Sequence, residues 1–336
     1  MKAYEIQQGA QSLEGLRQVE RPAPVALPGQ ILVRMRAASL NFRDQAIVTG
    51  RYFSGPVARN TVPLSDGAGE VVALGAGVTR FKVGDRVSGT FFQGWHDGPP
   101  PGPLVALGSP ADGVLAEYVA FNQNDAVSIP KSLSFEEGAT LACAGVTAWH
   151  AIAGVCRVKP GDSVLLLGTG GVATIALQLA RAAGARIIVT SSSDEKIARA
   201  RALGADAGVN YKRAPEWDKE VMTLTGGRGV DHIIELGGPG TLARSMRSVG
   251  YAGHIALIGV LAGFEGDTNP HPLMLKGASL HGIFVGNRAH FEQLNAAIEV
   301  NRIKPVIDRT FAFEAAADAY RHQLAGAFGK VVIRIS

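Results

Sequence analysis

The sequence predicts an α/β protein of two domains, one an antiparallel, barrel-like β domain and the other a doubly wound parallel sheet covered by helices. In the first third of the chain, short apolar runs are separated by Gly, Pro and Asp at close spacing, which indicates an antiparallel β domain. From residue 135 onward, apolar strands alternate with helical segments, which is typical of a parallel sheet. The length of 336 residues also exceeds what one hydrophobic core usually fills.

The antiparallel domain is expected over residues 1–125 and is completed by residues 287–336. The C-terminal segment has a helical candidate at 288–300 and a closing strand at 330–335, too little for a domain of its own, so we expect it to return to the first domain. The Gly- and Pro-rich segment 94–103 is expected to be a surface loop. The other strand candidates of this domain are residues 1–10, 30–40, 69–78, 84–92 and 115–121.

The parallel domain is expected over residues 126–286. Six apolar segments have the length and composition of buried strands, and amphipathic segments such as 195–204 and 216–226 are expected to be helices between them. The expected strands are residues 163–168, 185–190, 206–211, 229–236, 253–259 and 278–286.

Composition and charge exclude several classes of protein. Apolar residues make up 46% of the chain and charged residues 18%, which is typical of a soluble globular protein. Lysine and arginine exceed aspartate and glutamate by 33 to 29 but are dispersed, so nucleic acid is not an expected partner. The uncharged run 163–180 has glycines in its middle, which indicates a strand, a tight loop and a buried helix, so a membrane is not expected either. The first residues lack the apolar segment of a signal peptide, and two cysteines suit a reducing interior, so we expect a cytoplasmic protein.

A glycine-rich turn between a strand and a helix predicts a dinucleotide site. Gly168, Gly170 and Ala173 form a G-x-G-x-x-A pattern directly after the strand 163–168. Glycine permits the tight turn and the approach of a pyrophosphate, alanine lets the helix pack on the strand, and the helix N-terminus attracts the phosphates. We expect the contacts from Gly168, Thr169, Gly170, Gly171, Val172 and Ala173.

The second strand of this unit ends without the carboxylate that would bind the ribose of NAD. Ser191 lies about 20 residues beyond the glycines, at the position of that carboxylate. Ser191 and Ser192 can donate hydrogen bonds to the extra phosphate of NADP, and Lys196 can add positive charge. The alternative is that Ser192 and Glu195 form a capping box for the next helix. Since capping does not explain the missing carboxylate, NADP(H) is the expected cofactor.

Several motifs together resemble the medium-chain dehydrogenase/reductase superfamily, in its zinc-independent, quinone-oxidoreductase-like branch. The resemblance runs through PGQILVRMRAASLNFRD, GAGEVVALGAGVTRFKVGDRV, CAGVTAWHA, GTGGVA and GKVVIRI in this order. It implies a GroES-like catalytic domain built from both chain ends, a Rossmann domain for the cofactor, and a homodimer or homotetramer.

The same resemblance implies that this chain has no zinc. Alcohol dehydrogenases of the superfamily bind catalytic zinc with Cys, His and Cys beside a Glu, and the matching positions here are Asn41, Ser65 and Cys143 beside Asp66. One cysteine without imidazole or sulfur partners does not make a zinc site. The lobe that holds four cysteines in those enzymes lacks cysteine here, so a structural zinc is not expected either.

Without a metal, the expected substrate is already electrophilic. A reduced nicotinamide can transfer hydride to a quinone or to the β-carbon of an α,β-unsaturated carbonyl compound, and the protein then stabilises the developing oxyanion. By resemblance to quinone and enoyl reductases, Asn41 and Tyr52 contact the substrate and Tyr52 is the candidate acid; the alternative is that Tyr52 only packs on the barrel. Two other functions stay open: an NAD(P)-dependent alcohol or aldehyde dehydrogenase-like enzyme, and a non-catalytic NADPH-binding, crystallin-like protein.

Other roles follow from the resemblance, each beside a simpler alternative. Arg43 and Asp44 are expected to form an ion pair that holds their loop, and His150 is expected to be a satisfied helix histidine rather than a proton relay. Thr147 is either near the nicotinamide or a helix cap, Tyr211 either contacts the adenosine side or packs at a strand end, and Lys330 either reaches the cofactor or is an exposed lysine. The remaining cofactor positions by resemblance are Gly259, Val260, Phe284 and Val285.

Overall fold

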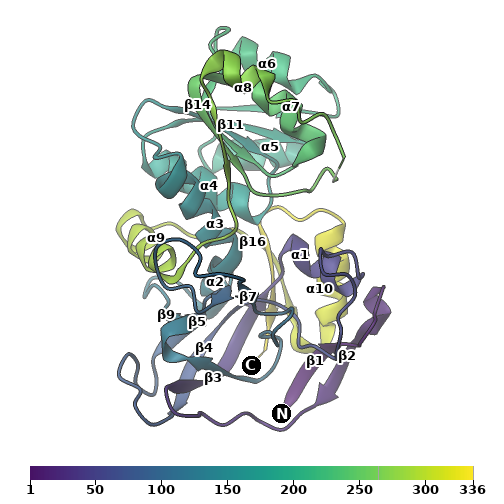
Figure 1. Ribbon diagram of the computed structural model, residues 1–336, viewed down its shortest axis with the longest axis vertical. Helices are drawn as coiled ribbons and strands as arrows, with labels where there is room; N and C mark the ends of the chain where they lie inside the picture. The colour runs from purple at the N-terminus through teal and green to yellow at the C-terminus, as the bar shows by residue number, and fades with distance from the viewer. Residues whose placement is uncertain (264, 336) are drawn as a thin grey trace. The chain divides into compact units, whose positions relative to one another are not determined.

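The computed structural model describes residues 1–263 and 265–335. The chain divides into two compact units, Met1–Val146 with Gly286–Ser336 as the first and Thr147–Val285 as the second (Figure 1). In the described part of the chain, no helix combines the length and the apolar character needed to cross a bilayer. The two units correspond to the antiparallel and the parallel domain that the sequence predicts.

The first unit is built on a seven-stranded sheet in which the order is β16-β17-β3-β4-β5-β9 and β8 pairs with β3. All pairs are antiparallel except β16 with β17. Two small sheets, β1-β2 and β6-β7, complete the unit. The strands are β1 (Lys2–Ile6), β2 (Leu16–Glu20), β3 (Gln30–Ser39), β4 (Asp66–Leu74), β5 (Arg86–Gly89), β6 (Phe92–Gln93), β7 (Val105–Ala106), β8 (Tyr118–Asn122), β9 (Ala126–Ser128), β16 (Ile307–Ala312) and β17 (Lys330–Arg334).

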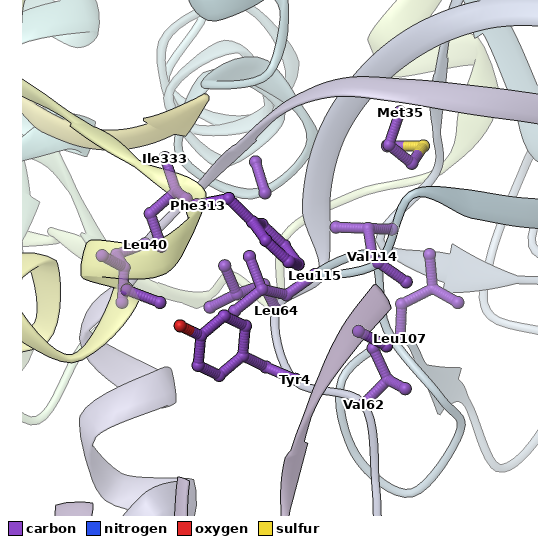
Figure 2. Packing of buried hydrophobic residues seen from close by; sticks show 14 of the residues in the cluster. Tyr4, Met35, Leu40, Val62, Leu64, Leu107, Val114, Leu115, Phe313 and Ile333 are labelled. Atoms are coloured by element: carbon purple, nitrogen blue, oxygen red, sulfur yellow. The ribbon is translucent and has the colours of Figure 1, made fainter. Parts of the chain in front are cut away.

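The core of this unit is formed by residues from both chain ends. In β3, Ile31, Val33 and Met35 are buried while the residues between them are half-buried, the alternation expected of a strand with one face on the core. The ring of Tyr4 packs edge-on against Phe313 with centroids 5.1 Å apart, and Figure 2 shows both rings in one cluster of apolar side chains. The prediction that the C-terminal segment returns to the first domain is thereby confirmed.

The first unit has short helices after β3 and after β9 and two longer helices in its C-terminal segment. α1 follows β3 directly, and residues 126–146, expected in the second domain, belong to the first unit because β9 pairs with β5 and the backbone N–H of Cys143 donates to Asp66 at 3.1 Å. The helices are α1 (Phe42–Val48), α2 (Phe135–Gly138), the π-helical turn η3 (Leu141–Gly145), α9 (Arg288–Asn301) and α10 (Ala316–Leu324), with α3 (Val146–Trp149) at the boundary.

The second unit is a six-stranded parallel sheet in the order β12-β11-β10-β13-β14-β15. This confirms the predicted doubly wound fold, and a strand is present at each of the six expected places, although β14 already begins at Val249 and β15 ends at Gly282 rather than at 286. The strands are β10 (Ser163–Leu167), β11 (Arg186–Ser191), β12 (Ala207–Asn210), β13 (Val230–Glu235), β14 (Val249–Leu257) and β15 (Ser279–Gly282). The helices are η4 (His150–Val155, π-helical), α4 (Gly171–Ala182), α5 (Asp194–Ala202), α6 (Trp217–Leu224), α7 (Pro239–Ser248) and α8 (His271–Lys276).

Candidate active site

The glycine-rich turn lies where the strand order of the parallel sheet reverses. β10 pairs with β11 on one side and with β13 on the other, so the chain moves outward from β10 and later returns to its opposite side. In doubly wound sheets, ligands bind beyond the carboxyl ends of the strands at this reversal. Residues 168–170 follow β10 directly and lead into α4, so the expected dinucleotide site has the position that this topology favours.

The backbone of this turn leaves room for a pyrophosphate. Gly168 has φ +84°, a left-handed conformation that favours glycine. A Cβ atom added to Gly168 or Gly170 would meet no other atom within 4 Å. α4 begins at Gly171 with no acidic residue in its first turn, so its free N–H groups and the positive end of its dipole are available to an anion. Residues 168–173 therefore fit a dinucleotide phosphate.

Ser191 is the last residue of β11 and is 2% exposed. Its hydroxyl oxygen accepts a hydrogen bond from the backbone N–H of Ser193 at 3.4 Å. The N-cap of α5 is Ser193, whose hydroxyl oxygen accepts from the backbone N–H of Lys196 at 3.3 Å. The predicted capping box of Ser192 and Glu195 is therefore wrong by one residue, because β11 continues to Ser191 and the helix starts later than expected.

The structure brings Tyr211 beside Ser191 at the carboxyl edge of the sheet. Tyr211 follows β12, and its backbone N–H donates to the carbonyl oxygen of Ser191 at 3.0 Å. Its side chain is 41% exposed, which contradicts ordinary strand-end packing as its main role. Lys196 lies in the first turn of α5, close in sequence to the same edge. The contacts of all three residues with NADP(H) stay predictions.

The segment around Val285 is fixed by His150. Val285 has φ +52°, an unusual conformation for a β-branched residue, and its carbonyl oxygen lies 2.8 Å from Nδ1 of His150. This contact confirms that His150 is a satisfied helix histidine, while Phe284 is 52% exposed beside it. Thr147 is 2% exposed inside the helical run η3-α3-η4, so the alternative that it caps a helix is wrong.

Glu235, which the sequence analysis did not single out, organises the turn after β13. Its side chain is fully buried. One carboxylate oxygen accepts hydrogen bonds from the backbone N–H groups of Gly237 at 2.7 Å and Gly238 at 3.0 Å and from the Thr241 hydroxyl at 2.6 Å, and the other accepts from the Ser245 hydroxyl. The available signal was a lone carboxylate that ends the apolar segment 229–236 and is followed by two glycines.

The turn that Glu235 holds lies against a segment with predicted cofactor contacts. A Cβ atom on Gly238 would lie 2.6 Å from the carbonyl oxygen of Gly259 and 3.0 Å from the Cα atom of Val260. The backbone N–H of Leu261 also donates to the carbonyl of Leu236 at 3.1 Å. The positions of Gly259 and Val260 therefore depend on the glycines of the neighbouring turn.

In the first unit, two of the three residues at the positions of zinc ligands, Ser65 and Cys143, meet around the buried carboxylate of Asp66. Asp66 begins β4 and is 0% exposed. It accepts hydrogen bonds from the hydroxyl of Ser65 at 2.8 Å and from the backbone N–H of Cys143 at 3.1 Å. The third residue, Asn41, is linked to the same carboxylate through a lysine.

That lysine is Lys330, the first residue of β17, and its side chain is 3% exposed. Its ammonium group donates a hydrogen bond to Oδ1 of Asn41 at 2.6 Å and lies 3.6 Å from Oδ2 of Asp66. The alternative that Lys330 is an exposed lysine is wrong, because β17 pairs with β3 inside the sheet and buries its first residue. Its contact with the cofactor stays a prediction.

This cluster does not have the chemistry of a zinc site. Zinc in proteins is bound by thiolate, imidazole and carboxylate groups, whereas Asn41 and Ser65 offer an amide and a hydroxyl, and an ammonium group contacts Asn41 and Asp66. Burial, and then the charge of Asp66, raise the pKa of the Cys143 thiol, which disfavours the thiolate. Across residues 1–263 and 265–335, no group of three or more His, Cys, Asp or Glu side chains is arranged to hold a metal ion.

Arg43 and Asp44 have separate partners. Arg43 donates to the carbonyl oxygens of Leu107 at 2.8 Å and Ser109 at 3.1 Å, whereas Oδ2 of Asp44 accepts from the backbone N–H of Asn41 at 2.7 Å. The prediction that an ion pair between these two side chains holds their loop is therefore wrong. Instead, Arg43 fixes the distant loop 107–109 and Asp44 fixes the start of α1.

Tyr52 lies beside Arg43 at the edge of the first core. The guanidinium carbon of Arg43 is 5.2 Å from the centroid of the Tyr52 ring and 4.7 Å from that of Phe91, so the cation lies against two aromatic rings. The Tyr52 ring also packs against the core, but the residue is only partly buried. Packing and a contact with substrate are both compatible with this position, and the role of Tyr52 as an acid stays a prediction.

The buried carboxyl group of Asp44 makes stability depend on pH. Burial raises its pKa to about 6 from 3.8, against the opposing effect of Arg43, and its Oδ1 atom has no hydrogen-bond partner in the part of the chain that the structure describes. A pKa raised by folding stabilises the protein most below about pH 4, and this contribution is lost as the pH rises through about 6. We therefore expect Asp44→Asn, which cannot ionise, to gain about 1–3 kcal/mol in unfolding free energy relative to wild type between about pH 4 and 7. Urea unfolding of both proteins measures this; a difference that does not change with pH contradicts it.

Two family models match the chain. The model described as "Alcohol dehydrogenase GroES-like domain" matches residues 27–131, and the model described as "Zinc-binding dehydrogenase" matches residues 171–299. They fall on the antiparallel sheet and the parallel sheet, respectively. The name of the second model implies a metal, which the residues of the cluster around Asp66 do not fit.

Proteins that match nearly the whole chain are named either as alcohol dehydrogenases or as quinone oxidoreductases. A zinc-type alcohol dehydrogenase-like protein of Schizosaccharomyces pombe is 42% identical over 99% of both chains. A quinone oxidoreductase of Rattus norvegicus is 31% identical over 93% of this chain and 90% of its own. The crystal structure of a putative alcohol dehydrogenase from Sinorhizobium meliloti is 43% identical, covers 100% of both chains and superposes with a TM-score of 0.91. The relatives with higher identity thus have alcohol-dehydrogenase names, and identity alone does not favour the quinone-oxidoreductase branch.

Proposed function

Because the chain belongs to the medium-chain dehydrogenase/reductase superfamily of NAD(P)-dependent oxidoreductases, we propose that it is a zinc-independent, NADPH-dependent reductase of quinones or α,β-unsaturated carbonyl compounds. The observation that carries the proposal is the cluster around Asp66, in which an amide, a hydroxyl and an ammonium group replace the ligand types that zinc prefers. Without a Lewis acid, an unactivated alcohol is a poor substrate, whereas a quinone or an enone accepts hydride directly.

The residues of each unit have separate tasks in this reaction. When bound, the reduced nicotinamide supplies a hydride, and residues 168–173 with Ser191 hold the phosphates of its carrier. Hydride addition at the β-carbon of an enone moves an electron pair onto the carbonyl oxygen, and a proton from Tyr52 or from water at the α-carbon completes the saturated product. Asn41 donates a hydrogen bond to that oxygen as its negative charge develops.

The deciding experiment compares acceptors and alcohols with one preparation of metal-analysed protein. We expect NADPH oxidation with members of a panel of quinones, enones and enals, and no gain when zinc is added. An alcohol dehydrogenase function, favoured by the names of the more identical relatives, predicts instead oxidation of simple alcohols with NADP⁺ that zinc stimulates or that metal-free protein already performs. Binding of NADPH without reduction of any acceptor would contradict the proposal and support a non-catalytic, crystallin-like role.

The choice of NADPH over NADH depends on Ser191, and Ser191→Asp tests it. A carboxylate at this position repels the 2′-phosphate of NADPH and can bind the 2′-hydroxyl of NADH, so we expect the Kd for NADPH to rise about 30-fold and the Kd for NADH to fall. The backbone N–H of Ser193 can donate to the new carboxylate as it does to the serine. Titration followed by cofactor fluorescence measures both constants.

Ser193→Ala is the matched control for Ser191→Asp. It removes the N-cap of α5 and is expected to lower stability by about 1 kcal/mol without changing the ratio of the two Kd values. If both variants change the ratio equally, or if wild type binds NADH as tightly as NADPH, the serines act as a helix cap and NADPH preference is refuted.

Self-association is also part of the proposal. β15 is an edge strand of the parallel sheet, and Leu280 on it is 39% exposed, which suits pairing with a second copy of the chain. Light scattering over a range of protein concentrations tests for a homodimer or homotetramer, and a monomer at all concentrations contradicts it.

A further inference from the structure

Hydrogen bonds hold the backbone and the side-chain oxygen of Asn41 but leave its side-chain nitrogen without a partner in the described part of the chain. Its backbone N–H donates to Asp44 at 2.7 Å, and its Oδ1 atom accepts from the Lys330 ammonium at 2.6 Å. The Nδ2 atom is buried and has no hydrogen-bond partner among the described residues. Buried amide donors without a partner are costly and therefore rare, so this group calls for a ligand acceptor.

Lys330 decides which end of the Asn41 amide is unpaired. An ammonium group has three donors and no acceptor, so only the oxygen of the amide can face it. The amide oxygen therefore accepts from Lys330, and the NH₂ group is the end of the amide that has no partner within residues 1–263 and 265–335. A hydrogen bond of 2.6 Å from a charged donor is short and strong, and it resists rotation of the amide.

We propose that Lys330 is a positioning residue that orients and polarises the Asn41 amide, so that its NH₂ group donates to the carbonyl or quinone oxygen of the substrate. This inference rests on the proposed reductase function and adds to it the source of the fixed positive charge. The ammonium group withdraws electron density through Oδ1, which makes the NH₂ group a stronger donor when negative charge develops on the substrate oxygen. Asn41 contacts the substrate, and Lys330 acts through Asn41.

The ammonium group of Lys330 is held between the Asn41 amide and the Asp66 carboxylate, and both contacts fix the position of its charge. Asp66 lies 3.6 Å from Nζ, beyond ordinary hydrogen-bond distance, and its oxygens already accept from Ser65 and from the backbone of Cys143. The closest partner of the ammonium group is therefore the neutral amide of Asn41. Since Lys330 is the first residue of β17, its backbone is held by the neighbouring strand: its N–H donates to the carbonyl of Val306 at 2.9 Å, and it pairs with Ile307 of β16.

Three variants of Lys330 separate charge, hydrogen bonding and packing. Lys330→Met keeps much of the volume and removes both charge and donor, Lys330→Gln keeps a neutral donor, and Lys330→Arg keeps the charge. We expect kcat with the best acceptor of the panel to fall about 30-fold in Lys330→Met and less in Lys330→Gln, and Lys330→Arg to recover most of the activity. The Kd for NADPH and the KM for the acceptor should change less than threefold in all three.

A purely structural role predicts a different pattern. In that case Lys330→Met lowers the melting temperature while kcat per folded molecule stays at the wild-type value, and this result would overturn the inference. A loss of NADPH binding that matches the loss of kcat would overturn it too, because Lys330 would then act on the cofactor.

A spectroscopic measurement tests the inference without any turnover. In protein labelled with ¹⁵N-asparagine, the side-chain NH₂ signals of Asn41 are identified by their absence in Asn41→Ala. We expect these signals to move in Lys330→Met and to return toward their wild-type position in Lys330→Arg, while the signals of Asn295 stay unchanged. Unmoved Asn41 signals refute the inference. If wild type reduces no acceptor, the proposed function fails, and the position of these signals still decides whether Lys330 polarises the amide.

Discussion

Replacement of Glu235 by alanine is expected to lower the free energy of unfolding of the second unit by about 4 kcal/mol, since four donors lose their acceptor at once. Each buried donor left unsatisfied costs about 1–3 kcal/mol, and water entering the space left by the side chain recovers part of the sum. The two hydroxyl groups can turn to other acceptors, whereas the backbone N–H groups of Gly237 and Gly238 cannot. Urea unfolding followed by circular dichroism measures the change.

Two further variants test whether the loss of stability comes from the hydrogen bonds of the buried Glu235 carboxylate rather than from the loss of any glutamate. Glu235→Gln keeps one acceptor oxygen and is expected to cost about half as much as Glu235→Ala. Glu220→Ala removes an exposed glutamate from α6 of the same unit and should change stability by less than about 0.5 kcal/mol. If Glu235→Ala and Glu220→Ala destabilise equally, the hydrogen bonds of Glu235 do not hold the turn.

The sequence predicts most of the fold because its main signals are local. The alternation in β3 and the apolar runs of the parallel strands are visible within short windows, and the turn at Gly168 follows its strand directly. The sequence predicts that the first domain ends at residue 125, whereas the first unit continues to Val146, because β9 pairs with β5, which lies about 40 residues earlier in the chain. The cap of α5 was misplaced by one residue since three consecutive serines offer equally good caps.

The candidate site was predicted in part for the same reason. Asn41 was expected to contact substrate, but its partner Lys330 lies 289 residues away, and no periodic pattern indicates a contact across that separation. Lys330 was placed near the cofactor or in solvent because a lysine at the start of a strand is usually exposed. Its burial results from the pairing of β17 with β3, which brings the C-terminal strand to the residue that precedes α1.

Asn41→Ala is expected to lower kcat for the best quinone or enone acceptor by about 100- to 1000-fold, as removal of an oxyanion donor does in other enzymes. The loss should appear in kcat and in kcat/KM to a similar degree, because the hydrogen bond strengthens as charge develops on the substrate oxygen. Steady-state kinetics at saturating NADPH measures it. Asn295→Ala is the control for removal of a buried asparagine from the same unit, since Nδ2 of Asn295 donates to the carbonyl of Ser128 at 2.9 Å, outside the cluster around Asp66; it should lower stability and leave kcat unchanged.

Asn41→Asp distinguishes the two roles of Asn41, which are to donate a hydrogen bond to the substrate through its NH₂ group and to bind Lys330 through its Oδ1 atom. A carboxylate at this position still accepts from Lys330, so the contact that ties α1 to β17 is kept and even strengthened by charge. It offers no NH₂ group, however, and its negative charge repels an oxyanion. We therefore expect Asn41→Asp to fold as stably as Asn41→Ala or better and to lose at least as much activity. If Asn41→Asp retains wild-type kcat, Asn41 serves only to hold Lys330 in place, and the oxygen of the acceptor must find its donor on another residue such as Tyr52.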